Sequence, residues 1–144
     1  MQFHGRNLRK GRFSAPNYIY HVTATTKNRN PVFSDFYAAR TIIQTLKQED
    51  VLSSTLTLSF VVMPDHLHWL FVLQNGELSN IVRRVKSVTS KKLGVAIWQN
   101  GFYDHAIRAE EDLIGTARYI VANALRSKLV EQIGDYPHWD CIWL

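Results

Sequence analysis

The chain has 144 residues, 46% hydrophobic and 20% charged, which predicts one globular domain over residues 1–144 and argues against a disordered chain. No stretch approaches the roughly 20 apolar residues of a membrane span, and the single cysteine, Cys141, excludes an internal disulfide framework and suits the reducing cytoplasm. The formal net charge of +5 favours a polyanionic partner such as nucleic acid.

The first half of the chain predicts three strands and one helix. Residues 1–15 form a basic arm that carries Arg6, Arg9, Lys10 and Arg12. β-branched and aromatic residues predict strands over residues 18–26, 55–63 and 66–73. Helical spacing of apolar residues predicts a helix over 36–48, with Ser34 or Asp35 as its N-cap.

The second half predicts two helices and a fourth strand. An apolar stripe predicts a helix over 78–93, and Gly94 is a plausible C-cap. Residues 95–107 are interpreted as a strand interrupted by a turn at Asn100-Gly101. A last helix is predicted over 108–128, and the Trp-rich tail, residues 134–144, is expected to pack back on the domain.

The first six elements therefore follow the order β-α-β-β-α-β. This order is typical of the ferredoxin-like (split βαβ) arrangement, an α+β fold with an antiparallel sheet. Helices are expected to cover one face of the sheet and to leave the other open for a substrate or a further helix. The strand over residues 66–73 is predicted to be central.

Two histidines in that strand, His66 and His68, are one residue apart. Residues i and i+2 of a strand point to the same face, so the two imidazoles form a candidate pair of ligands for one divalent metal ion. Histidines on a sheet are more often structural, so the pair alone is a weak indication. Asp65, directly before it, either hydrogen-bonds a histidine or faces away.

Tyr119 and Asn123 are four residues apart and share one face of the last helix. A phenol beside a cation loses its proton more easily and becomes an oxygen nucleophile, and an amide oxygen can bind a hard cation. On spacing alone, a half-buried core tyrosine and a surface asparagine are the more common outcome. Tyr103 is a rival nucleophile without an i+4 amide.

Three segments together resemble one family. Residues 63–70, Met-Pro-Asp-His-Leu-His-Trp-Leu, resemble the His-hydrophobic-His motif of the HUH single-tyrosine transposases. Residues 118–130 resemble that family's Tyr-Ile-x-x-Asn-Pro-x-Arg-Ala-Gly-Leu-Val signature, with Ala124 in place of proline and Ser127-Lys128 in place of Ala-Gly. Residues 20–33 and 98–112 resemble its first strand and the approach to its tyrosine helix. The resemblance is strongest to the REP-associated tyrosine transposases.

The resemblance implies an enzyme that nicks and rejoins single-stranded or hairpin DNA through a 5′-phosphotyrosine intermediate. It implies that Tyr119 is the nucleophile and that His66, His68 and Asn123 hold Mg²⁺ or Mn²⁺. Cytoplasmic DNA is then the partner, and whether the protein acts as a monomer or a homodimer is left open. The alternative is a non-catalytic single-stranded nucleic-acid-binding or regulatory module derived from a transposase.

Several further residues are candidates for contacts with DNA. The basic ones are Arg6, Arg9, Lys10, Arg12, Arg83, Arg84, Lys86, Lys91 and Lys92, each about as well explained as a solvated surface residue. The aromatic ones that stack bases or fill the core are Tyr18, Tyr20, Trp69, Trp98 and Phe102. His21 and His105 are phosphate-binding, proton-transfer or structural residues.

Overall fold

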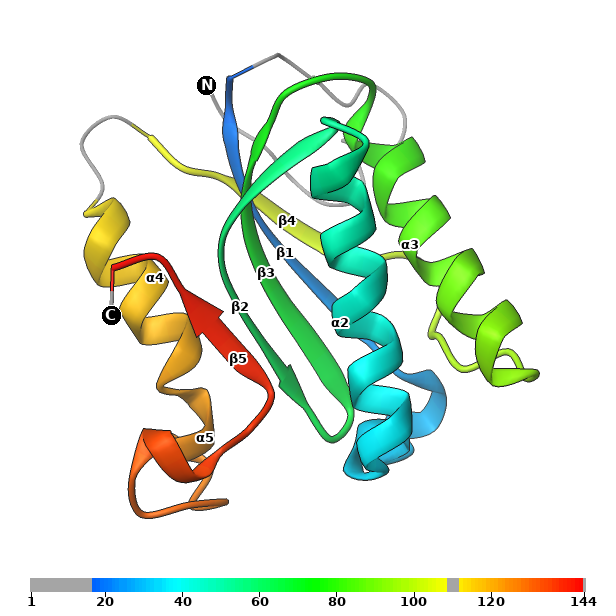
Figure 1. Ribbon diagram of the computed structural model, residues 1–144, viewed down its shortest axis with the longest axis vertical. Coiled ribbons are helices and arrows are strands. Elements are labelled where there is room, and N and C mark those ends of the chain that lie inside the picture. Colours follow the sequence, from blue (N-terminus) through cyan, green and yellow to red (C-terminus); the bar gives the residue numbers. More distant parts are fainter. Residues whose placement is uncertain (1–16, 109–111, 144) are drawn as a thin grey trace.

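The computed structural model describes residues 17–108 and 112–143, which form a five-stranded antiparallel sheet flanked by helices (Figure 1). The elements are β1 (Ile19–Thr25), α2 (Phe36–Val51), β2 (Thr55–Met63), β3 (His66–Leu73), α3 (Leu78–Leu93), β4 (Tyr103–Ala106), α4 (Leu113–Val121), α5 (Asn123–Arg126) and β5 (Trp139–Cys141). The strand order is β4-β1-β3-β2-β5. This order confirms the ferredoxin-like prediction and the central place of β3.

Local sequence signals explain most element boundaries. The Asp35 carboxylate accepts a hydrogen bond from the Ala38 backbone N–H at 2.8 Å, so Asp35 is the N-cap of α2. α2 runs three residues past the predicted end, to Val51. α3 ends at Gly94, whose φ of +78° lies in the left-handed region that glycine adopts without strain. β2, β3 and α3 have the predicted bounds.

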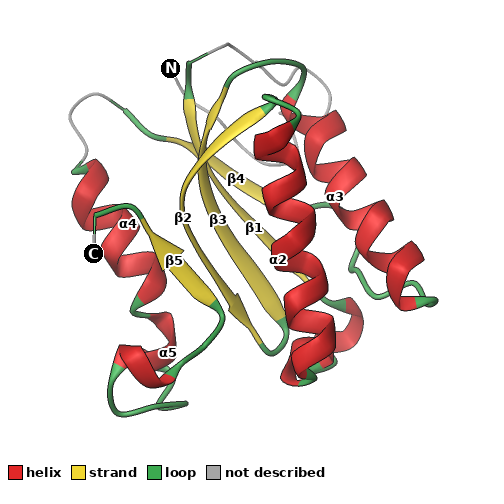
Figure 2. Ribbon diagram, viewed as in Figure 1, coloured by secondary structure: helices red, strands yellow, loops and turns green. Residues whose placement is uncertain are grey.

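The sheet has one face covered by α2 and α3, which lie side by side in one layer (Figure 2). Alternate residues of β3, among them Leu67, Trp69 and Phe71, are buried in the core cluster under these helices. The residues that alternate with these in β3, including His66 and His68, therefore point to the opposite face. The main hydrophobic core thus orients the two histidines away from itself.

The opposite face is partly covered by α4 and α5, which pack over β2 and β5. Ala117, Ile120 and Ala124 of these helices share a second buried cluster with Val61 and Met63 of β2. The predicted open face is thus half covered by a further helix, at its β2 side.

The last helix differs from the single helix predicted over 108–128. It begins at Leu113, because the Asp112 carboxylate caps the Gly115 N–H at 2.9 Å, and residues 109–111 lie outside the described residues. It is interrupted at Ala122 and resumes as α5. The Asn123 side-chain amide donates to the Ile120 carbonyl at 2.7 Å, and such side-chain bonds compete with the helical backbone pattern.

The fourth strand and the tail refine two further predictions. Only Tyr103–Ala106 forms β4, while Trp98, before the turn, makes a single bridge to Thr26. The tail packs back on the domain as predicted, and does so as β5, which pairs with β2. The basic arm, residues 1–15, lies outside the described residues. Among the described helices, none combines the length and apolarity that crossing a membrane requires.

Candidate active site

The two histidines of β3 lie side by side on the half-covered face. Their ring centroids are 4.9 Å apart, and both side chains are half-buried. Across the strand pair, Thr25 of β1 faces His66 and Thr23 faces His68. On the other side, Met63 and Val61 of β2 pair with the same two histidines.

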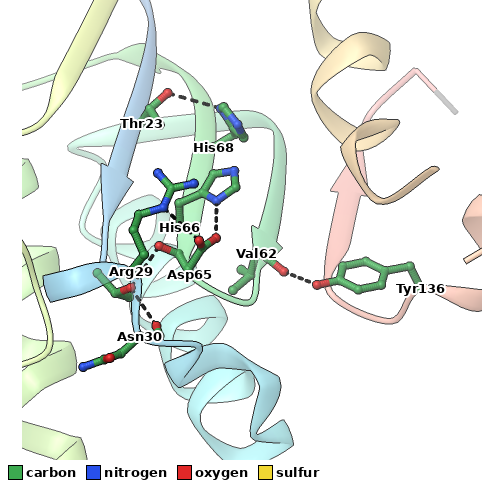
Figure 3. A network of polar contacts seen from close by, with 9 residues as sticks. Thr23, Arg29, Asn30, Val62, Asp65, His66, His68 and Tyr136 are labelled. Carbon is green, nitrogen blue, oxygen red and sulfur yellow. Dashed lines mark hydrogen bonds and ion pairs between the residues drawn. The ribbon is translucent and has the colours of Figure 1, made fainter. Parts of the chain in front are cut away.

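Each histidine has its Nδ1 engaged by a neighbouring side chain. His66 Nδ1 donates to the Asp65 carboxylate at 2.7 Å, and Arg29 Nε donates to the same carboxylate at 2.9 Å (Figure 3). His68 Nδ1 lies 3.0 Å from His21 Nε2 and 3.2 Å from Thr23 Oγ1. Nε2 of both rings is therefore the atom left to bind an external ligand, and such outer contacts orient ligating histidines.

The surroundings of His68 and His21 keep these two imidazoles neutral near pH 7. Burial lowers the pKa of His68 to about 3, and the charges of His21, His66 and Arg126 act in the same direction. Burial and the charge of His105 lower the pKa of His21 to about 4. A neutral imidazole is the form that binds metal ions.

Asp65 carries the charge that orients His66. Burial alone would raise the pKa of its carboxyl, but the hydrogen bonds and charges of His66 and Arg29 outweigh burial and lower that pKa. Asp65 is therefore ionised near neutral pH and accepts from both partners. Of the two roles that the sequence left open for Asp65, the structure has the hydrogen bond to a histidine.

The helices α4 and α5, which carry Tyr119 and Asn123, pack on β2, the strand next to the histidines. Ile120 and Ala124 are buried in the same cluster as Val61 and Met63, the cross-strand partners of His68 and His66. Tyr119, next to Ile120, is 63% exposed. The guanidinium carbon of Arg126 lies 3.5 Å from the centroid of the Tyr119 ring.

Asn123 is half-buried on the same helix pair. Its amide nitrogen is used by the Ile120 carbonyl, which makes Oδ1 the atom that can bind a cation. Within residues 17–108 and 112–143, no three His, Cys, Asp or Glu side chains gather as a cation site. The predicted ligand set, two imidazoles and one amide, consists of nitrogen and oxygen donors of the kind that bind divalent ions.

Tyr103, the rival nucleophile, lies on the same face of the sheet. It pairs with Thr23, which in turn pairs with His68, so the three residues form one row across β4, β1 and β3. Its side chain is 71% exposed. His105 pairs with His21 two residues further along β4. Tyr103 is thus two strands away from His68, and exposure does not distinguish it from Tyr119.

The predicted phosphate-binding residues of α3 lie in the helical layer on the far side of the sheet from the histidines. Arg84 makes two hydrogen bonds, at 2.6 and 2.7 Å, to the buried carboxylate of Glu49. Lys86 Nζ donates to the Gln99 and Gly101 carbonyls at 2.8 and 2.7 Å. Lys91 and Lys92 are exposed at the end of the helix. Arg84 and Lys86 thus have structural partners.

Arg83 is exposed and lines a cavity of about 620 Å³ beside α3, together with Lys86, Trp98 and Phe102. The arm residues Arg6, Arg9, Lys10 and Arg12 lie outside the described residues. Of the predicted aromatic residues, Tyr20 and Trp69 are core residues with 0% and 1% exposure, so their rings are not available to a base. Tyr18 is 37% exposed.

Three residues of the site carry no role in the sequence prediction. Strand register brings Thr23 to His68, and a turn in which Arg29 adopts a positive φ of 55° brings Arg29 to Asp65, the carboxylate that orients His66. Arg126 lies beside Tyr119 and occupies the arginine position of the family's Tyr-Ile-x-x-Asn-Pro-x-Arg signature. That signature was the only feature of the sequence that could have predicted its place.

Comparisons with known proteins agree with this architecture. The model of a family described as "Transposase IS200 like" matches residues 14–123. A REP-associated tyrosine transposase of Escherichia coli (strain K12) is 33% identical over 82 residues, which cover 55% of this chain and 50% of that protein. A putative REP-associated tyrosine transposase of Haemophilus influenzae is 26% identical over 99 residues, 57% of this chain and 56% of that protein. The chain thus matches about half the length of each relative.

Solved structures show the same fold. A REP-associated tyrosine transposase bound to a REP hairpin superposes with a TM-score of 0.74 at 23% identity, covering 96% of this chain and 81% of the other. A putative transposase from Deinococcus radiodurans has a TM-score of 0.55 at 16% identity, covering 81% and 92%. Since the family model spans well over half of the residues, histidine pair and tyrosine helix included, the chain belongs to the IS200-like transposase family.

Proposed function

We propose that the protein is a metal-dependent transposase that nicks and rejoins single-stranded DNA at hairpin sites through a covalent bond to Tyr119. The observation that carries the proposal is the pair His66 and His68, each with Nδ1 held and Nε2 available, beside a helix that exposes a tyrosine. A related transposase has been solved bound to a REP hairpin, which supports hairpin DNA as the substrate class.

The chain's own residues divide the chemistry between two elements. His66, His68 and the Asn123 amide would hold Mg²⁺ or Mn²⁺. When bound, the ion neutralises a non-bridging oxygen of the scissile phosphate and orients the phosphorus for in-line attack. Asp65 and Arg29 on one side, and His21 and Thr23 on the other, hold the imidazole rings in place.

Tyr119 supplies the nucleophile. Its phenol oxygen forms a bond to phosphorus and gives its proton to solvent, while the bond from phosphorus to the 3′ oxygen breaks and that oxygen takes up a proton. The products are a 5′-phosphotyrosine and a free 3′-hydroxyl. Attack of a 3′-hydroxyl on the phosphotyrosine reverses these changes and rejoins a strand without an external energy source.

The test is incubation of labelled single-stranded hairpin DNA with the full chain and Mg²⁺ or Mn²⁺, followed by denaturing electrophoresis. We expect an adduct that survives denaturant, disappears with EDTA and is lost in Tyr119→Phe. Tyr103→Phe is the matched control, because Tyr103 is also exposed on this face, and it should retain the adduct.

Two other outcomes and one further measurement distinguish the alternatives. An adduct that persists in Tyr119→Phe and is lost in Tyr103→Phe would transfer the nucleophile role to Tyr103. Salt-sensitive DNA binding without an adduct, unaffected by EDTA, would favour a non-catalytic nucleic-acid-binding or regulatory module. The mass of the complex in solution, measured in the same samples, tells whether one chain or a homodimer acts.

A further inference from the structure

The Arg126 side chain lies against the ring of the proposed nucleophile. Its guanidinium carbon is 3.5 Å from the centroid of the Tyr119 ring, although both residues are exposed. Seven residues rise about 10.5 Å in an unbroken helix. The contact therefore uses the length of the arginine side chain, and it spans the interruption between α4 and α5 at Ala122.

The backbone carries Arg126 toward the histidine pair. Two residues earlier, Ala124 is buried together with Val61 and Met63 of β2. These two β2 residues are the cross-strand partners of His68 and His66 and point to the same face.

We infer that Arg126 is a second active-site cation, which steadies the Tyr119 ring and donates hydrogen bonds to the scissile phosphate. This inference rests on the proposed function. A phosphate under attack by Tyr119 and held from the histidine side has to lie between the two, and the Arg126 guanidinium lies against the attacking Tyr119 ring. Guanidinium can stack on an aromatic ring with its face and bind phosphate oxygens with its edge, whereas the ammonium of lysine has no such planar fork.

The charge of Arg126 would act where negative charge accumulates during the reaction. In the transition state, negative charge is spread over the three equatorial oxygens of the phosphoryl group. A hydrogen-bond donor fixed beside these oxygens lowers the barrier without forming a covalent bond to the substrate. Removal of one such donor in other enzymes costs about 10²–10³-fold in rate. DNA affinity depends on many phosphate contacts, so loss of one should weaken it only slightly.

The experiment compares three variants at saturating hairpin DNA, by the single-turnover rate of adduct formation. Arg126→Gln should lower that rate about 100-fold while the DNA dissociation constant changes by less than about three-fold. Arg126→Lys keeps the charge and should fall between Arg126→Gln and the wild type. Arg118→Gln is the matched control, because Arg118 is an exposed arginine of α4 that donates to the Trp143 carbonyl instead, and its rate should stay within two-fold.

A second readout separates catalysis from a structural role. Guanidinium ion added at millimolar concentration should restore part of the rate to Arg126→Ala and leave Arg118→Gln unchanged. Equal rates in Arg126→Gln and Arg118→Gln, with a Tyr119-dependent adduct present, would overturn the inference alone, as would slow adduct formation that guanidinium ion does not improve. Absence of any adduct with the wild-type chain would overturn the proposed function, and the inference with it.

Discussion

The two faces of the sheet differ in the side chains that the central strand β3 presents to them. In β3, Leu67, Trp69 and Phe71 are at most 1% exposed under α2 and α3, whereas His66 and His68, which alternate with them, are half-buried on the other face. The first face gives stability through close packing. The second exposes polar groups held by hydrogen bonds, so that side chains with ligand chemistry stand on a rigid strand.

The largest contrast is expected between positions on opposite faces of β3. Phe71→Ala should lower the free energy of unfolding by about 3–5 kcal/mol, because it leaves a cavity under α2 and α3. His68→Ala on the other face should lower it by about 1 kcal/mol or less and still abolish adduct formation. Urea denaturation and the adduct assay on both variants check this. A large stability loss in His68→Ala would mean that the histidine face is also structural.

A smaller effect is expected for Arg84, a predicted DNA contact that instead pairs with Glu49 in the layer formed by α2 and α3. Arg84→Ala should destabilise the protein by about 2–3 kcal/mol, because the Glu49 carboxylate that it pairs with is buried and would be left uncompensated. Arg83→Ala on the same helix is the control and should change stability by about 0.5 kcal/mol or less. Thermal denaturation distinguishes them. Equal stability of the two variants would make Arg84 a surface residue, free for phosphate.

The smallest of the three effects concerns pH and the histidine face. The pKa of His21 is lowered to about 4 in the folded protein from its ordinary value of 6.5, so the unfolded chain takes up the proton first as the pH falls. The stability that neutral His21 contributes is complete above pH 6.5 and is lost toward pH 4.

The measurement is the difference in unfolding free energy between the wild type and His21→Asn, from urea titrations at pH 7, 5.5 and 4. This difference should shrink as the pH falls, because only the wild type has to protonate the buried imidazole. Carboxylates titrate equally in both proteins and cancel. A difference that stays constant over this range would show that His21 is solvated enough to protonate freely.

The sequence predicted the face under α2 and α3 better than the histidine face, for a physical reason. Apolar periodicity and caps are local, so β2, β3 and α3 were predicted with their observed bounds. β5 was missed as a strand because its three residues are too few to show alternation, and pairing with β2 is what makes it one. The interruption at Ala122 depends on a side-chain hydrogen bond of Asn123 that periodicity does not detect.

The site itself was predicted as two halves. Strand geometry predicted that His66 and His68 share a face, and helical spacing predicted the same for Tyr119 and Asn123. The contacts that hold the imidazole rings depend on the register between β1 and β3. His21 is diagonal to His68, within hydrogen-bond distance, only because Thr23 pairs with His68. The assignment of ligands and nucleophile stays a prediction until the adduct is measured.

The tail strand has a consequence for how the molecule meets other chains. β5 occupies the outer edge of β2, and the Tyr136 hydroxyl donates to the Val62 carbonyl beside it. In the described part of the chain, the other edge is the four-residue β4, which offers few backbone groups for strand addition. The middle of β2, a largely buried strand next to the histidines, is therefore shielded by the chain's own tail from edge-to-edge aggregation.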